Sequence, residues 1–257
     1  MTMHIANPIY NVVFNFMMED KKAAKPFLSA IIEEEVLDID DATQKRTFRR
    51  SLNNPTEKEE EEKLFLSVCR FNFYAKIQVS DGGFKTVTIE LQKAKFPWDV
   101  MRFRYYPGSH YLHPINTYDS KRNKNACCFY RIFLLGQDIG IPDCPIVCVD
   151  YKFKNGKTEE CLDATNEFLR SLDSRSWIIQ LEQLKQYCRN DVEKLLSIFN
   201  QENWTSNQHI LNVNEDEFPE KYHPIIRRLH IASQKADIQK AMEQEDDFMQ
   251  ELLSVKI

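Results

Sequence analysis

Residues 64–91 constrain the fold most, because they have the pattern of two β-strands joined by a tight turn. Apolar and aromatic residues dominate from Leu64 to Val79, and in the second segment Val87 and Ile89 alternate with threonines. The turn between the two segments is Asp81-Gly82-Gly83, a sequence typical of β-hairpins. We therefore predict an antiparallel hairpin, around which the rest of the chain has to pack.

The periodicity of the remaining residues predicts an α/β fold. The expected order is two helices, the hairpin, one helix, two strands and further helices. Helical spacing covers 7–17, 22–32, 97–106, 177–199 and 224–255, and buried strands are expected at 128–135 and 146–153. Asn7 is the expected cap of the first helix, and the polar stretches 42–63 and 200–219 are expected connections. We interpret residues 1–205 as one main domain and 206–257 as a linker followed by an amphipathic helix.

Composition limits the partners and the location of the chain. The 257 residues carry a net charge of -5, so the surface lacks the broad basic field of an electrostatic nucleic-acid binder, and any DNA contact must be local. Seven cysteines without a CxxC pair indicate reduced thiols in a reducing compartment. No apolar run approaches the roughly 20 residues that cross a bilayer, and the first residues do not resemble a signal peptide. We expect a soluble, cytoplasmic protein without a membrane partner.

A polar group is expected on one face of the hairpin. Glu90 and Gln92 point to the same face, because side chains alternate along a strand, while Leu91 points into the core. Asn72 can lie opposite Glu90, since the two positions are nearly equidistant from the turn. Oxygen ligands of this kind hold Mg²⁺ or Mn²⁺ in phosphodiesterases, where a nearby Lys or Gln orients the nucleophile. Spacing alone favours a simpler interpretation, in which the pair is the solvated face of an edge strand.

Several segments, in this order, resemble the PD-(D/E)XK nuclease family transposases, which are relatives of the recombination-promoting nucleases. These segments are 7–16, Arg70 to Lys76, the strand Ile89-Glu90-Leu91-Gln92-Lys93, Met101 to Tyr106, and 180–199. The resemblance spans most of residues 7–250. It implies a restriction-endonuclease-like mixed sheet flanked by helices, here with a C-terminal helical extension, and Mg²⁺- or Mn²⁺-dependent cleavage of DNA.

The resemblance also assigns roles to the hairpin residues. Glu90 becomes a metal ligand, and Gln92 takes the lysine position of the ExK motif, with Lys93 or Lys95 nearby to help position water. Asn72 stands where the family has a metal-binding Asp. An amide offers one neutral oxygen in place of a carboxylate, so the site would hold a hard cation more weakly. The chain is then either a natural pseudo-nuclease or a nuclease disabled by replacement of the Asp.

Two further segments are candidates for DNA contacts. Arg102, Arg104 and Tyr106 follow the motif on an expected helix, and the loop with Lys121, Arg122 and Lys124 is a small basic cluster. Each set is also explained as ordinary solvated surface.

Other polar residues are weaker candidates. His110 and His113 have the spacing of a metal-binding pair but no third ligand in the sequence. Glu19 and the trio Glu33-Glu34-Glu35 could supply an additional acidic ligand, although surface charges at helix ends explain them as well.

Three functions remain open. The first is a magnesium-dependent DNA endonuclease, and the second is a catalytically silent DNA- or protein-binding module that keeps the fold. In the third, the amphipathic stretch 224–255 makes the chain a homodimerisation partner, because this helix needs either the domain or a second copy to cover its apolar stripe.

Overall fold

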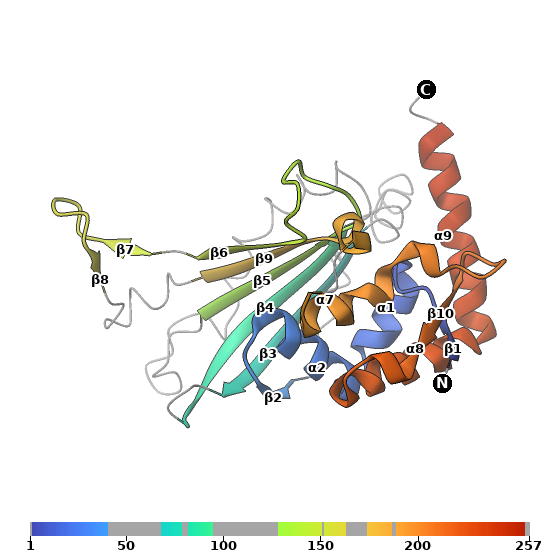
Figure 1. Cartoon of the computed structure of the whole chain (residues 1–257), viewed down its shortest axis with the longest axis horizontal. Coiled ribbons are helices and arrows are strands. Elements are labelled where there is room, and N and C mark those ends of the chain that lie inside the picture. The colour runs from blue at the N-terminus through green and yellow to red at the C-terminus, as the bar shows by residue number, and fades with distance from the viewer. Residues whose placement is uncertain are drawn as a thin grey trace, which may run out of the picture.

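The computed structural model describes residues 2–40, 68–78, 82–94, 128–150, 152–162, 174–186 and 189–254 (Figure 1). The connection predicted at 42–63, the helix at 97–106 and the basic loop at 121–124 lie outside these residues. Among the described residues, no helix is both long enough and apolar enough to cross a membrane.

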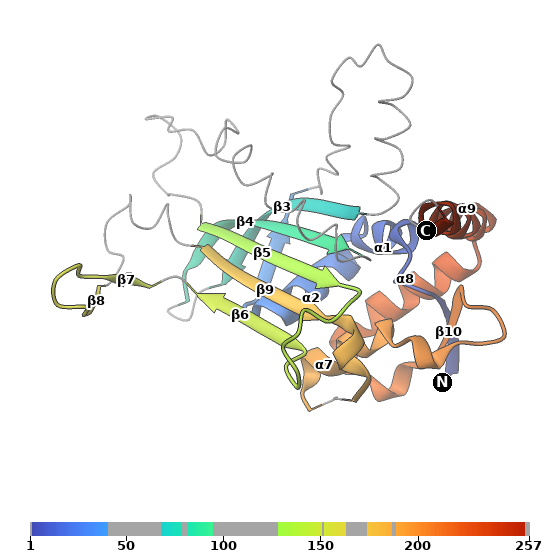
Figure 2. The ribbon, with the colours of Figure 1, turned by 90° about the horizontal axis from the view of Figure 1, so that it is seen from above.

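A mixed sheet of six strands forms the centre of the structure, in the order β2-β3-β4-β5-β9-β6. The strands are β2 (Val36–Ile39), β3 (Val68–Gln78), β4 (Phe84–Ala94), β5 (Cys128–Leu135), β9 (Ser174–Gln180) and β6 (Ile146–Asp150). β3 is antiparallel to β2 and to β4, β5 is parallel to β4 and to β9, and β6 is antiparallel to β9. The predicted hairpin is therefore confirmed, as is the general α/β class with a mixed sheet and flanking helices. Beyond β6, a short pair of strands, β7 (Phe153–Lys154) and β8 (Cys161–Leu162), extends away from the sheet (Figure 2).

The described helices include five α-helices and several short 3-10 helices. The α-helices are α1 (Asn11–Met18), α2 (Lys21–Ile32), α7 (Asp191–Leu196), α8 (His223–Ser233) and α9 (Ala236–Ser254). The 3-10 helices are η2 (Leu181–Gln186), η3 (Ser197–Phe199), η4 (Gln201–Asn203), η5 (Glu215–Glu217) and η6 (Glu220–Tyr222). α2 matches its prediction, and the Asp20 side chain caps it by accepting a hydrogen bond from the Lys22 amide.

The first helix begins later than predicted. Asn7 was the expected cap, but its Oδ1 accepts a hydrogen bond from the Ile9 amide in a turn that precedes the helix, and Tyr10 is the N-cap residue. An Asn side chain can bond to backbone two residues on, and this local bond competes with a capping bond. The helix prediction at 177–199 is also wrong over its first residues, because Trp177 lies in β9 between two neighbouring strands.

The main core lies between the sheet and the helices on one of its faces. Phe71 of β3 packs edge-on against Phe14 of α1, with ring centroids 6.0 Å apart, and Phe14 packs against Phe27 of α2 at 5.8 Å. Ile89 and Leu91 of β4 are fully buried on the same face. Burial of each such side chain contributes roughly 1.5–3 kcal/mol, so the alternate residues of the hairpin anchor it to the helices.

The C-terminal residues belong to the same core. β10 (Ile210–Asn214) pairs antiparallel with β1 (Thr2–Ala6), so the loop predicted at 200–219 contains a strand. The helix predicted at 224–255 is divided into α8 and α9, and Leu229 of α8 and Met242 of α9 are buried in the main cluster. α9 contacts α1 of its own chain, where the Glu245 carboxylate accepts hydrogen bonds from the Asn11 and Val12 amides. These bonds stabilise the positive end of α1.

Candidate functional site on the outer face of the hairpin

The polar residues of the hairpin lie together on the face that points away from α1 and α2. Phe71 and Phe73 point toward the helices, so Asn72 between them points to the opposite face. The register of the two strands places Asn72 directly opposite Glu90, as the sequence predicts. Both side chains are 3% exposed, so this is a buried group and not the solvated edge that spacing alone favoured.

Gln92 holds the Glu90 side chain in place. The two residues are on one face of β4, and Gln92 Nε2 donates a hydrogen bond to Glu90 Oε1 at 2.6 Å. In this arrangement Gln92 orients Glu90 directly.

Asn72 differs from its neighbours, because its buried amide is unsatisfied. Neither Nδ2 nor Oδ1 has a hydrogen-bond partner among the residues that the structure describes. A buried polar group without a partner costs roughly 1–3 kcal/mol, and most folded proteins avoid it. The amide therefore has a donor and an acceptor that a ligand at this face could satisfy.

Lys93 is not part of this group. It follows Gln92 directly, so its side chain points to the helix face, where Nζ donates to the Ile9 carbonyl at 2.6 Å and to Asn11 Oδ1 at 2.7 Å. The structure therefore brings together Asn72, Glu90 and Gln92, and it places Lys93 on the other side of the sheet. The alternation of side chains along a strand already implies this separation.

Arg131 joins the group, although it is not among the candidates of the sequence analysis. β5 runs parallel to β4 with Arg131 beside Glu90, and the next residue of this row on β9 is Ser176. Arg131 is half-buried, and its Nε is buried without a hydrogen-bond partner among the described residues. A charged residue inside an otherwise apolar strand was the available signal, but its position beside Glu90 depends on the register of two strands that are distant in sequence.

The acidic residues from the early helices lie elsewhere. Glu34, in the turn after α2, accepts hydrogen bonds from Lys85 Nζ at 3.1 Å and from the Tyr130 hydroxyl at 3.0 Å. Tyr130 belongs to the helix face of β5 and packs against Trp177, and burial raises the pKa of its hydroxyl. Glu34 is therefore separated from Glu90 by the sheet.

The predicted DNA contacts lie outside the described residues. These residues are Arg102, Arg104, Tyr106, Lys121, Arg122 and Lys124. The same holds for His110 and His113.

The oxygen donors of the group suit a hard divalent cation, but the group carries little negative charge. Asn72 Oδ1 and the Glu90 carboxylate are oxygen donors, which Mg²⁺ and Mn²⁺ prefer, and Asn72 Oδ1 has no other partner among the described residues. Glu90 contributes one negative charge, and the described residues contain no cluster of three or more His, Cys, Asp or Glu that could hold a metal. Asn72 and Glu90 could therefore contribute two ligands to a weak site.

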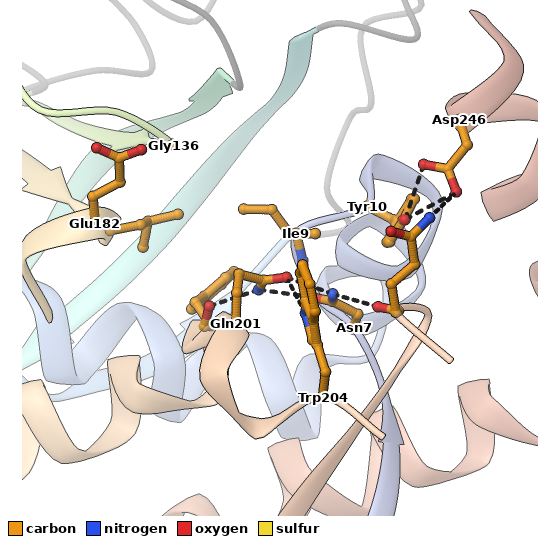
Figure 3. A pocket seen from close by; sticks show the side chains of 11 residues that line it. Asn7, Ile9, Tyr10, Gly136, Glu182, Gln201, Trp204 and Asp246 are labelled. Atoms are coloured by element: carbon orange, nitrogen blue, oxygen red, sulfur yellow. Dashed lines mark hydrogen bonds between the residues drawn. The ribbon is translucent and has the colours of Figure 1, made fainter. Parts of the chain in front are cut away.

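A separate pocket of about 290 Å³ lies beside the start of α1 (Figure 3). Asn7, Gln201 and Trp204 form a connected set of hydrogen bonds at its wall, with Asn7 Nδ2 donating to Gln201 Oε1 at 2.7 Å and Trp204 Nε1 donating to the same oxygen at 2.9 Å. The Tyr10 hydroxyl donates to Asp246 Oδ1 at 2.9 Å, and burial raises the pKa of this hydroxyl. Because these groups satisfy one another, the pocket offers weaker evidence for a ligand than the unsatisfied amide of Asn72.

The chain matches no known protein-family model, no curated protein and no solved structure. The function has to be inferred from the group formed by Asn72, Glu90, Gln92 and Arg131.

Proposed function

We propose that this chain is a metal-dependent DNA endonuclease of the PD-(D/E)XK type in which Asn72 has replaced one ligand carboxylate and weakened the metal site. The observation that carries the proposal is the buried, unpartnered amide of Asn72 directly opposite Glu90. A solvated strand face would leave both side chains in water, and a purely structural pair would satisfy the amide.

The arrangement of the strands supports the same proposal. An antiparallel run β2-β3-β4 follows helix α2, and β5 then adds parallel to β4. A mixed sheet flanked by helices agrees with the general class that the resemblance to the PD-(D/E)XK nucleases implies.

Each residue of the group has a role in this proposal. Glu90 and the Asn72 amide oxygen would hold Mg²⁺ or Mn²⁺, and Gln92 orients Glu90 through its 2.6 Å hydrogen bond. A bound divalent ion supplies an activated water and neutralises phosphate charge in phosphodiester hydrolysis. Lys93 takes no part in water positioning, because its side chain lies on the helix face.

A second candidate function is a catalytically silent module that binds DNA or protein. The position of Arg131 favours this alternative, because its positive charge beside Glu90 brings the net charge of the group to zero without a metal. A group with no net charge has little electrostatic attraction for a divalent cation.

Substitution of Asn72 by Asp separates the two candidates. Asn72→Asp restores a carboxylate opposite Glu90, so Mn²⁺ binding measured by calorimetry should tighten by about tenfold or more, and plasmid cleavage should rise. Without metal, the same variant should unfold at a lower temperature than the parent, because two buried carboxylates then repel each other, and Mn²⁺ should reverse this loss.

Two further variants serve as controls. Asn212→Asp adds the same charge at an exposed position of β10 and should change neither metal binding nor cleavage. The double variant Asn72→Asp, Glu90→Gln should lose the gain in both measurements, because the two ligands act together. If Asn72→Asp binds Mn²⁺ no more tightly than Asn212→Asp, the proposed metal site is wrong. The catalytically silent binding module is then the remaining candidate function.

A further inference from the structure

Four side chains form a row across the outer face of the sheet. The strand registers align Asn72, Glu90, Arg131 and Ser176 on β3, β4, β5 and β9 (Figure 2 shows the four strands side by side). Tyr130 and Ile132, which flank Arg131 in β5, are buried in the core on the helix face. The guanidinium of Arg131 therefore lies on the same face as Glu90 and Asn72.

Arg131 and Asn72 both present unsatisfied hydrogen-bond donors in this row. The Nε atom of Arg131 and the Nδ2 atom of Asn72 are buried, and neither donates a hydrogen bond to any described residue. A guanidinium has five N–H donors and no acceptor, so the partner that it lacks must be an acceptor, and an anion satisfies it best. The guanidinium fork matches the oxygens of phosphate in particular.

The charges of the row specify the anion further. Arg131 offers one positive charge to an anion and Glu90 beside it repels the anion, so a singly charged anion is easier to accept than a doubly charged one. A DNA phosphodiester carries one negative charge, whereas a terminal phosphate monoester carries up to two at neutral pH. A metal held by Glu90 and Asn72 would add positive charge on the other side of the same phosphate.

We propose that Arg131 is a phosphate-binding residue that donates to a non-bridging oxygen of a DNA phosphodiester lying over Glu90. This inference rests on the proposed function for the nature of the ligand, but it concerns a different residue and does not require a bound metal.

The test measures binding of a short fluorescein-labelled DNA duplex by anisotropy over a series of salt concentrations, first in EDTA and then in Ca²⁺. Arg131→Met should weaken binding by about tenfold and lower the dependence of affinity on salt by about one counterion. Arg131→Lys should keep the salt dependence and lose part of the affinity, because the charge remains and the fork is lost. Arg175→Met is the matched control, since Arg175 lies one strand away on the helix face and is paired with Glu34 and Asp150. It should leave both quantities unchanged.

Thermal melting of each variant distinguishes binding from folding. If Arg131→Met does not fold, a loss of affinity in Arg131→Lys at an unchanged melting temperature supports the proposal. Unchanged affinity and salt dependence in folded Arg131→Met overturns it, and so does a parent chain that binds no duplex in either buffer.

The outcome is independent of the metal test. If Arg131→Met binds DNA more weakly while Asn72→Asp gains no Mn²⁺ binding, the proposed phosphate site is supported and the proposed metal site is wrong. If Asn72→Asp gains Mn²⁺ while Arg131→Met keeps its DNA affinity, the metal site stands and the role of Arg131 is wrong.

Discussion

Two buried polar residues on opposite faces of the β3–β4 hairpin differ in whether their hydrogen bonds are made. On the helix face, Lys93 is 2% exposed and its ammonium donates to the Ile9 carbonyl and to Asn11. On the outer face, Asn72 is 3% exposed and its amide has no partner among the described residues. Both residues lie in paired strands of the same hairpin and are equally buried, so burial alone does not explain the difference.

This difference separates groups that hold the fold from groups that are free for a ligand. A buried charge is tolerated when its hydrogen bonds are made, and loss of one partner is then strongly destabilising. A buried amide without partners contributes no hydrogen bond to stability, so its removal should not be costly. Stability measurements on matched substitutions can test this division directly.

The largest effect is expected from Lys93→Met. Methionine keeps most of the side-chain volume but leaves the Ile9 carbonyl and Asn11 Oδ1 without their donor, so the free energy of unfolding should fall by about 3 kcal/mol. Urea denaturation followed by circular dichroism measures this change. A loss below about 1 kcal/mol would mean that the bonds of Lys93 do not hold α1 to the sheet.

A smaller effect is expected from Glu245→Gln. Glu245 belongs to α9 and contacts the start of α1, the helix end that Lys93 also contacts. The glutamine keeps one acceptor but removes the negative charge that two amides at the start of α1 share, so unfolding should become easier by about 1–2 kcal/mol. Glu243→Gln, at an exposed position of the same helix, is the control and should be nearly neutral. An equal effect of the two variants would show that the charge of Glu245 is not engaged at α1.

The smallest effect is expected from Asn72→Leu. The substitution removes a buried amide without partners and keeps a similar volume, so stability should change by less than about 1 kcal/mol or increase. The same urea denaturation applies, with Lys93→Met as the reference. A loss of more than about 2 kcal/mol would show that Asn72 is hydrogen-bonded in the folded protein, and the contrast between the two faces would then disappear.

Much of the candidate site follows from the local pattern. The turn at Asp81-Gly82-Gly83 and the alternation of the two strands predict that Asn72 lies opposite Glu90 and that Gln92 shares the face of Glu90. The same alternation places the Lys93 side chain on the opposite face from this group. The position of Lys93 in the motif nevertheless suggested a role beside Gln92. The position of a residue within a motif does not determine which face of a strand it occupies.

Other features could not be read from the local pattern. β1 and β10 pair although they lie near opposite ends of the chain, and neither five-residue segment identifies its partner by itself. Asn7 has the sequence of a helix cap, yet the turn before α1 uses its side chain, and Asn7 also bonds to Gln201 in η4. Such contacts depend on elements that come together only in the folded chain.

The sequence by itself determined the hairpin, its register and the order of polar and apolar residues on its two faces, because these follow from a tight turn and from the two-residue period of a strand. Tertiary structure decided which face the helices cover, and it is this covering that gives Lys93 partners at the start of α1. Tertiary structure also decided that β5 adds parallel to β4 with Arg131 beside Glu90. Pairing between distant strands is specified by the packing of the whole core and by no short stretch of sequence, so the residue proposed to bind phosphate becomes visible only in the assembled sheet.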